Sequence, residues 1–179
     1  RAMIRTFKMR RIITAAQAAI FAQIVVVSSI VRASEPVAVD LELVLAVDIS
    51  RSMDVDERHL QRRGYVEALR HPAVANAVRS GLHGKIALTY MEWSAQWTVE
   101  TIVPWALVET ETDLYRIAKI LEESPVVQGS GTSISGALTA ATAEFSSNDF
   151  AGLRRVIDVS GDGPNNLGGS VLIARAKTL

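Results

Sequence analysis

Apolar and polar positions along the chain alternate in two different ways, and their order predicts the fold class. Nearly continuous apolar runs, typical of strands buried on both faces, occur at Asp40–Asp48 and Arg154–Val159. Two further strand-like runs, Lys85–Ser94 and Trp97–Val108, are close enough in sequence to form a hairpin. Pro104 lies inside the second of these runs and favours an edge strand, because proline cannot donate to a neighbouring strand.

Helical spacing fills the intervals between these strands. The predicted helices are a first with Leu60, Tyr65, Ala68 and Leu69, ended by His71-Pro72, a second around Val74–Val78, a third over Thr112–Glu123 capped by Thr112, a fourth from Ile134 to about Phe145, and a fifth over Val171–Lys177. Strands that alternate with helices predict an α/β fold with a mostly parallel sheet and an antiparallel edge hairpin. Because the last helix has no strand after it, we expect the fold to be C-terminally incomplete at Leu179.

The N-terminal segment has the pattern of an export signal. Several arginines and a lysine precede an uncharged run, Ile12–Val31, and Val31-Arg32-Ala33 resembles a small-residue cleavage site. We therefore expect residues 1–33 to be a signal peptide and residues 34–179 to form the domain, in the periplasm or outside the cell. The run also has the length of a membrane span, so the alternative is an uncleaved anchor in the inner membrane.

Composition narrows the classes of function. Hydrophobic residues make up 49% and charged residues 21% of the chain, the balance of an ordinary globular domain. Nineteen basic and nineteen acidic residues give no net charge, which argues against a nucleic-acid partner. The chain has no cysteine, which excludes disulfides, thiolate metal ligands and cysteine nucleophiles.

Three loops carry oxygen-rich side chains where strands are predicted to end. They are Asp48–Ser52 (Asp-Ile-Ser-Arg-Ser), Gly129–Ser133 (Gly-Ser-Gly-Thr-Ser) and Ser160–Gly163 (Ser-Gly-Asp-Gly). Ligands of open α/β sheets bind at the carboxyl ends of the strands, so these loops are expected to converge. Carboxylate and hydroxyl oxygens suit a hard divalent cation such as Mg²⁺, whereas softer metals prefer histidine or cysteine.

Each loop taken alone has a plainer interpretation. Asp48 or a nearby serine can simply cap the next helix, but Asp54, with acidic residues in the following turn, is already placed to do so. Thr132 in its Gly/Ser loop can be a turn with a helix cap, and Asp162-Gly163 an ordinary turn. Only the conjunction of the three loops favours a metal site.

The motifs Asp48-x-Ser50-x-Ser52, a later Thr132 and Asp162-Gly163, in this order and each after a predicted strand, resemble the metal-ion-dependent adhesion site of von Willebrand factor A domains. The stretches MEWS, VPW, GTSIS and RRVIDVSGDGPNN are similar to an uncharacterised exported bacterial branch with this fold. The resemblance implies a Rossmann-like, three-layer α/β/α domain.

It also implies a set of ligands. Ser50, Ser52 and Thr132 would hold Mg²⁺ or Mn²⁺, with Asp48 and Asp162 binding directly or through water. In this family an acidic residue of a partner protein often completes the coordination. Arg51 is a departure, because the family often has glycine there.

The favoured function is a non-enzymatic, metal-ion-dependent protein-binding module whose partner supplies a carboxylate. One alternative is a Mg²⁺-dependent hydrolase or phosphatase with Asp48 as nucleophile, although Ser50 stands where an acid/base partner is expected. Another is a structural domain whose metal only braces the three loops. A membrane contact is expected only if the N-terminal segment stays uncleaved.

A few other residues carry weaker signals. Trp93, Trp97 and Trp105 are expected to pack on or near the hairpin, with a partner-binding patch as the lesser alternative. Asn165-Asn166 is interpreted as a solvated turn, or else as part of the rim of the site. Asp158 interrupts an apolar strand and either is hydrogen-bonded or faces solvent.

Overall fold

The computed structural model describes residues 35–178 of the chain. The predicted signal peptide or anchor, residues 1–33, lies outside the described residues, so its assignment stays a prediction. No helix in the described part has both the length and the apolar character needed to cross a bilayer.

Within residues 35–178, four strands form a single sheet in the order β3-β2-β1-β4. Their bounds are β1 (Val37–Asp48), β2 (Ile86–Trp93), β3 (Val99–Val108) and β4 (Phe150–Ser160). The central strand β1 pairs in parallel with β2 on one side and β4 on the other, while β2 and β3 form an antiparallel hairpin. The predicted edge position of the strand that contains Pro104 is therefore confirmed.

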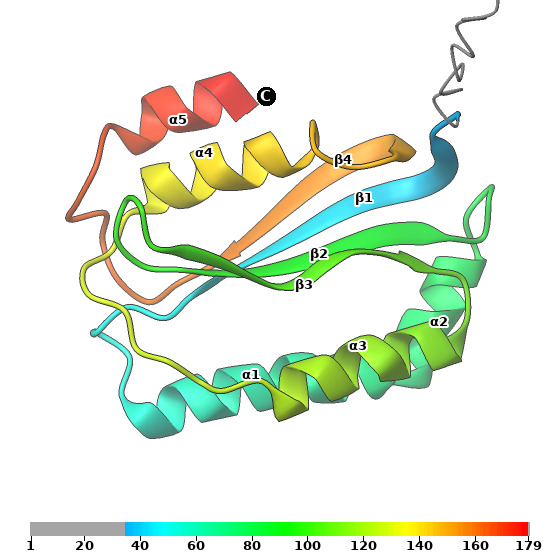
Figure 1. Cartoon of the computed structure of the whole chain (residues 1–179), viewed down its shortest axis with the longest axis horizontal. Coiled ribbons are helices and arrows are strands. Elements are labelled where there is room, and N and C mark those ends of the chain that lie inside the picture. The colour runs from blue at the N-terminus through cyan, green and yellow to red at the C-terminus, as the bar shows by residue number, and fades with distance from the viewer. Residues whose placement is uncertain (1–34, 179) are drawn as a thin grey trace, which may run out of the picture. The chain divides into compact units, whose positions relative to one another are not determined.

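In the part of the chain that the structure describes, five helices cover the two faces of this sheet. Their bounds are α1 (Val55–Arg70), α2 (Pro72–Arg79), α3 (Glu111–Glu123), α4 (Ile134–Glu144) and α5 (Val171–Thr178). Figure 1 shows α1, α2 and α3 on one face and α4 and α5 on the other. The predicted three-layer α/β/α architecture is confirmed.

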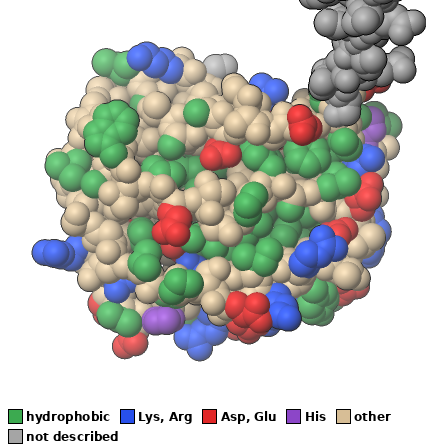
Figure 2. Space-filling model, in the orientation of Figure 1, with side chains coloured by type: hydrophobic (Ala, Val, Ile, Leu, Met, Phe, Trp, Pro, Cys, Tyr) green, Lys and Arg blue, Asp and Glu red, His purple; other side chains and the backbone are tan. Residues whose placement is uncertain are grey.

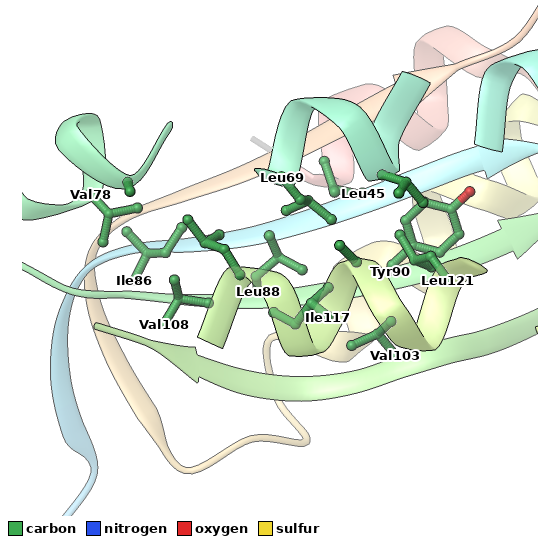
Figure 3. Packing of buried hydrophobic residues seen from close by; sticks show 14 of the residues in the cluster. Leu45, Leu69, Val78, Ile86, Leu88, Tyr90, Val103, Val108, Ile117 and Leu121 are labelled. Atoms are coloured by element: carbon green, nitrogen blue, oxygen red, sulfur yellow. The ribbon is translucent and has the colours of Figure 1, made fainter. Parts of the chain in front are cut away.

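The pleat of β1 sends alternate side chains into two separate cores. Leu45 and Val47 join the larger cluster, which lies between the sheet and helices α1 to α3 and is drawn in Figure 3. Val44 and Ala46 join the smaller cluster, which packs against α4. Because β1 is buried on both faces at this end, its sequence is continuously apolar until Asp48.

The inward face of α1 differs from the predicted apolar stripe. Leu60 is 64% exposed, whereas Arg58 and Arg62 are buried together with Val66 and Leu69. Arg62 forms an ion pair with the buried Glu92 of β2. The prediction missed this face because a periodicity argument assigns arginine to solvent, whereas here a carboxylate from a distant strand satisfies the guanidinium.

The cap of α3 also differs from the prediction. Thr110, not Thr112, is the N-cap, and its side chain accepts a hydrogen bond from the backbone N–H of Asp113. Asp113 in turn accepts from the backbone N–H of Thr110, at 2.9 Å, which completes a capping box. Thr110 and Thr112 are both plausible caps in the sequence. Asp113 lies three positions after Thr110, which is the spacing of a capping box, so Thr110 is the cap.

Two features of the connectivity bring distant loops to one place. Strand β1 is followed by helices on one face, whereas β4 is reached through α4 on the other face, so the carboxyl end of β1 is a point where strand order reverses. The segment from α3 to α4 passes the carboxyl ends of the strands as it moves from one face of the sheet to the other (Figure 1). Loops that follow β1, α3 and β4 therefore meet there.

Candidate metal centre

The first loop of the site is shaped by the end of β1. Beyond Asp48 the chain stays attached to the sheet, because the N–H of Ile49 donates to the carbonyl of Trp93 at 2.9 Å. The N–H of Ser50 then turns back and donates to Oδ1 of Asp48 at 2.7 Å. Asp48 and Ser50 are both fully buried, yet Oδ2 of Asp48 has no hydrogen-bond partner in the described part of the chain. A buried carboxylate oxygen without a donor is costly unless a cation or water satisfies it.

Helix capping does not account for these residues. Asp54 caps α1, since its Oδ1 accepts from the N–H of Glu57 at 2.8 Å. Glu57 closes a capping box by accepting from the N–H of Asp54, also at 2.8 Å. The predicted role of Asp54 is confirmed, so Asp48, Ser50 and Ser52 are not needed to cap α1.

A chain of hydroxyls connects the first loop to the third. The Oγ atoms of Ser50 and Ser52 are 2.8 Å apart, and Oγ of Ser52 donates to Oδ1 of Asp162 at 2.7 Å. Ser52 and Asp162 are 110 positions apart in sequence, so only the fold brings them together. The first and third predicted loops therefore converge.

The second loop reaches the same point. Thr132 is 2% exposed. A methyl group added at Gly163 would lie 3.5 Å from Oγ of Ser52 and 3.7 Å from Oγ1 of Thr132, so both hydroxyls flank the backbone that follows Asp162. A methyl group at Gly161 would lie 3.0 Å from the unpartnered Oδ2 of Asp48. All the residues proposed from sequence as ligands thus gather around one short glycine-containing turn.

The electrostatics of this cluster favour a bound cation. Burial, followed by the charge of Asp162, raises the pKa of Asp48, so the ionised pair is unfavourable without a counter-charge. Within residues 35–178, no group of three or more histidine, cysteine or acidic side chains is placed to hold a metal ion. The candidate donors are instead two carboxylates and three hydroxyls, and the chemistry of this set suits a hard divalent cation.

A family model described as "Protein of unknown function (DUF1194)" matches residues 38–179. The chain belongs to this DUF1194 family. The match spans the helices and strands described above, except for Val37, the first residue of β1. None of the curated proteins matches the sequence.

Several solved structures resemble the DUF1194 domain. One is proximal thread matrix protein 1 from the mussel byssus, "with zinc occupied MIDAS motif", at 17% identity and a TM-score of 0.57 over 81% of this chain and 36% of that one. BatB from Bacteroides thetaiotaomicron is 23% identical, with a TM-score of 0.51 over 77% of this chain and 60% of that one. The pilus adhesin SpaC from Lactobacillus rhamnosus GG is 18% identical, with a TM-score of 0.52 over 71% and 16%.

These likenesses establish the fold. The predicted von Willebrand A-like architecture of the DUF1194 domain is confirmed. The chain corresponds to about a third of the mussel protein, since it covers 36% of it.

Two asparagines of the DUF1194 domain hold the second and third loops together. Oδ1 of Asn166 accepts from the N–H of Thr132 at 2.8 Å, and the N–H of Asn166 donates to the carbonyl of Thr132 at 2.9 Å. Oδ1 of Asn165 accepts from the N–H of Ser135 at 3.2 Å. Of the two interpretations of this pair, the structure favours the rim of the site over a solvated turn.

The other residues singled out in the sequence lie away from the site or beside it. Arg51 is exposed, and so are the three histidines and Asp158, which settles the orientation of Asp158. Trp93 is buried beneath the site, where a methyl group at Gly161 would approach its ring to 3.3 Å. Trp97, in contrast, is 88% exposed at the hairpin.

Gly129 carries a constraint that the sequence did not indicate. Its N–H donates to the carbonyl of Ile49 at 2.8 Å, which ties the second loop to the first. A side chain there would place its Cβ 2.1 Å from Oγ and 2.3 Å from Cβ of Ser94. Ser94 is fully buried, so its side chain has little room to move aside. The close approach of Gly129 to Ser94, which follows β2, cannot be recognised from the sequence.

We expect Gly129→Ala to lower the free energy of unfolding by about 1–3 kcal/mol, because the added methyl group overpacks this contact. Adding Ser94→Gly should restore much of the loss, since it removes the side chain that clashes. Urea unfolding of the two variants and the wild type measures both effects. If the double variant Gly129→Ala/Ser94→Gly were no more stable than Gly129→Ala, the proposed clash between positions 129 and 94 would be contradicted.

Proposed function

We propose that residues 34–179 form a metal-ion-dependent protein-binding module of an exported protein, with no catalytic role. Its cation coordinates an acidic residue of a partner protein. The observation that carries this proposal is the convergence of three distant loops on one point, where no donor from residues 35–178 reaches the buried Oδ2 of Asp48. An adhesion-type role is also supported by the pilus adhesin among the similar structures.

The side chains of the site divide the proposed task between them. Ser50, Ser52 and Thr132 would hold the ion through their hydroxyl oxygens, and Asp48 and Asp162 would bind it directly or through water. The ion itself would supply a Lewis-acidic position open to a carboxylate. Mg²⁺ or Mn²⁺ is the proposed ion, because hard oxygen donors favour these cations. The zinc-occupied site of the mussel protein supports a divalent cation in general.

The chain's own residues favour binding over catalysis. A hydrolase needs an accessible nucleophile with a base beside it. Asp48, the nucleophile of the hydrolase alternative, is fully buried and already accepts a hydrogen bond from the N–H of Ser50. Each of the chain's histidines is exposed, and none lies in the three loops.

The decisive experiment compares partner capture in Mg²⁺ and in EDTA. The full gene product is immobilised and exposed to envelope and secreted proteins of its own organism, and captured proteins are identified by mass spectrometry. We expect Thr132→Ala to abolish capture of those that EDTA releases. Thr112→Ala, an exposed threonine on α3, is the matched control and should capture them normally.

The results distinguish the proposal from its alternatives. Replacing one aspartate or glutamate of the captured partner by its amide should prevent capture. A set of partners retained equally in EDTA and by Thr132→Ala would refute metal-dependent recognition. Stabilisation by Mg²⁺ without any metal-dependent partner would instead indicate that the ion only braces the loops.

A further inference from the structure

A groove beside the metal centre is not used by the proposed coordination. It lies between the tip of the β2–β3 hairpin and the helices α4 and α5, and its volume is about 510 Å³. Small side chains leave this space open along the two helices; they are Gly136, Ala140, Ala143 and Ala174. The space is large enough for one bulky side chain and its neighbours.

The rim of the groove exposes large apolar groups to solvent. Trp97 at the hairpin tip is 88% exposed, and Ile173 on α5 is 61% exposed. Figure 2 shows hydrophobic side chains at the surface on this side of the molecule, where the hairpin approaches α4. Exposed aromatic groups around an apolar hollow are typical of protein-binding surfaces.

The groove and the proposed metal centre are bordered by the same segment of chain. Its near end is formed by Ser135 and Gly169. Ser135 is bonded through its N–H to Asn165, at 3.2 Å, and the next residue, Asn166, holds the N–H of Thr132 at 2.8 Å. The same β4–α5 segment therefore borders both the proposed metal ligands and the groove. A chain bound at the centre can continue into the groove without leaving the surface.

The charges around this surface define what it would accept. Among residues 35–178, Lys177 is the one charged residue that lines the groove, and no acidic residue does. Arg51, which is exposed, adds a second positive group within the first loop of the centre. A segment that is acidic at one point and apolar at another complements this arrangement.

We propose that the groove binds a large apolar side chain, such as Leu or Phe, of the same partner segment whose carboxylate reaches the metal centre. The inference rests on the proposed function and deepens it, because it specifies the partner as an extended segment with an acidic and an apolar residue a few positions apart. The metal centre provides ion dependence, and the groove provides selection among acidic segments.

The test uses fluorescein-labelled, end-blocked octapeptides of Gly and Ser that contain one Asp and, two to five positions away on either side, one Leu. Matched peptides replace Leu by Ser, or Asp by Asn. Fluorescence anisotropy with the full gene product in Mg²⁺ and in EDTA gives the affinities. At the best spacing, Leu should improve the affinity about tenfold over Ser, because a leucine side chain leaves water.

Two variants locate this effect. Ala143→Arg places a long side chain in the groove from an exposed helix position. This variant should therefore bind the Leu and Ser peptides with about equal affinity. Ala68→Arg makes the same change on the exposed face of α1, on the other side of the sheet, and should keep the tenfold preference. The ratio of the two peptides cancels any general effect of the added charge.

The outcomes separate this inference from the proposed function. Binding that needs Asp and Mg²⁺ but is indifferent to Leu at every spacing would overturn the groove alone. A preference for Leu that persists in EDTA would keep the groove but refute the metal-dependent function, and no binding at millimolar peptide would refute both. Self-association of the protein abolished by Ala143→Arg, measured by sedimentation, would show a second copy in the groove and also overturn the inference.

Discussion

Replacing Asp48 by Asn is expected to abolish stabilisation by divalent cations. The wild type should gain about 3 kcal/mol in free energy of unfolding when Mg²⁺ is present at about a hundred times its dissociation constant. In a domain of this size the melting temperature should then rise by roughly 5–10 °C, and Asp48→Asn should show no rise. Differential scanning calorimetry with Mg²⁺, Mn²⁺ and EDTA measures both proteins.

The same substitution should behave differently without metal. Burial and the neighbouring Asp162 raise the pKa of Asp48 in the folded protein above its unfolded value. The folded state therefore disfavours the ionised form, and stability contributed by Asp48 is lost as the pH rises through the folded pKa. Asparagine carries no charge at neutral pH, so in EDTA we expect Asp48→Asn to melt no lower than the wild type.

The matched control is Asp149→Asn, an exposed aspartate just before β4, at the other end of that strand from the site. It should show the full rise in melting temperature with Mg²⁺. An equal rise in Asp48→Asn and the control would mean that the cation binds elsewhere. A large loss of stability of Asp48→Asn in EDTA would mean that Asp48 is structural.

Breaking the buried ion pair between α1 and β2 should have the largest effect on stability. The side chains of Arg62 and Glu92 are only 6% and 2% exposed, and Arg62 also donates to the carbonyl of Leu121 at 2.8 Å. Glu92→Leu leaves the guanidinium buried without its counter-charge. We expect it to lower the free energy of unfolding by about 3–5 kcal/mol, measured by urea denaturation.

Removing both charges should cost less than removing one. The pair is imperfectly satisfied within the described residues, because Nε of Arg62 and Oε2 of Glu92 have no partner there. The double variant Arg62→Met/Glu92→Leu should therefore be more stable than Glu92→Leu. The solvent-accessible pair Arg70–Glu122 is the control, and its loss should change stability by no more than about 1 kcal/mol. Equal costs for the two pairs would contradict this account.

Much of the site could be predicted because its chemistry is local to strand ends. Asp48, Thr132 and Asp162 follow or precede strong apolar patterns, and the parallel topology implies that such ends meet. The cap at Asp54 could also be recognised, because acidic residues fill the next turn. What these positions share is that each signal lies within a few residues of sequence.

The rest depended on contacts between distant segments. Arg62 looks like a solvated residue until Glu92 is placed beside it. The need for glycine at position 129 follows from Ser94, on another loop, and has no local signal. Asn165 and Asn166 form a common turn sequence, and only their bonds to the Thr132 loop show what they do.

The α3–α4 segment passes the carboxyl ends of the strands, so the site forms only from parts of the chain that are far apart in sequence. Since the proposed ligands come from loops attached to both helical layers, no excised peptide or half-domain contains a complete set. Ser52 meets Asp162 although the two are 110 positions apart in sequence. Closing so long a loop is a late, non-local step. Binding of a cation at this site would require that the whole chain from β1 to β4 has folded. The affinity for the cation would therefore report on complete folding of the domain.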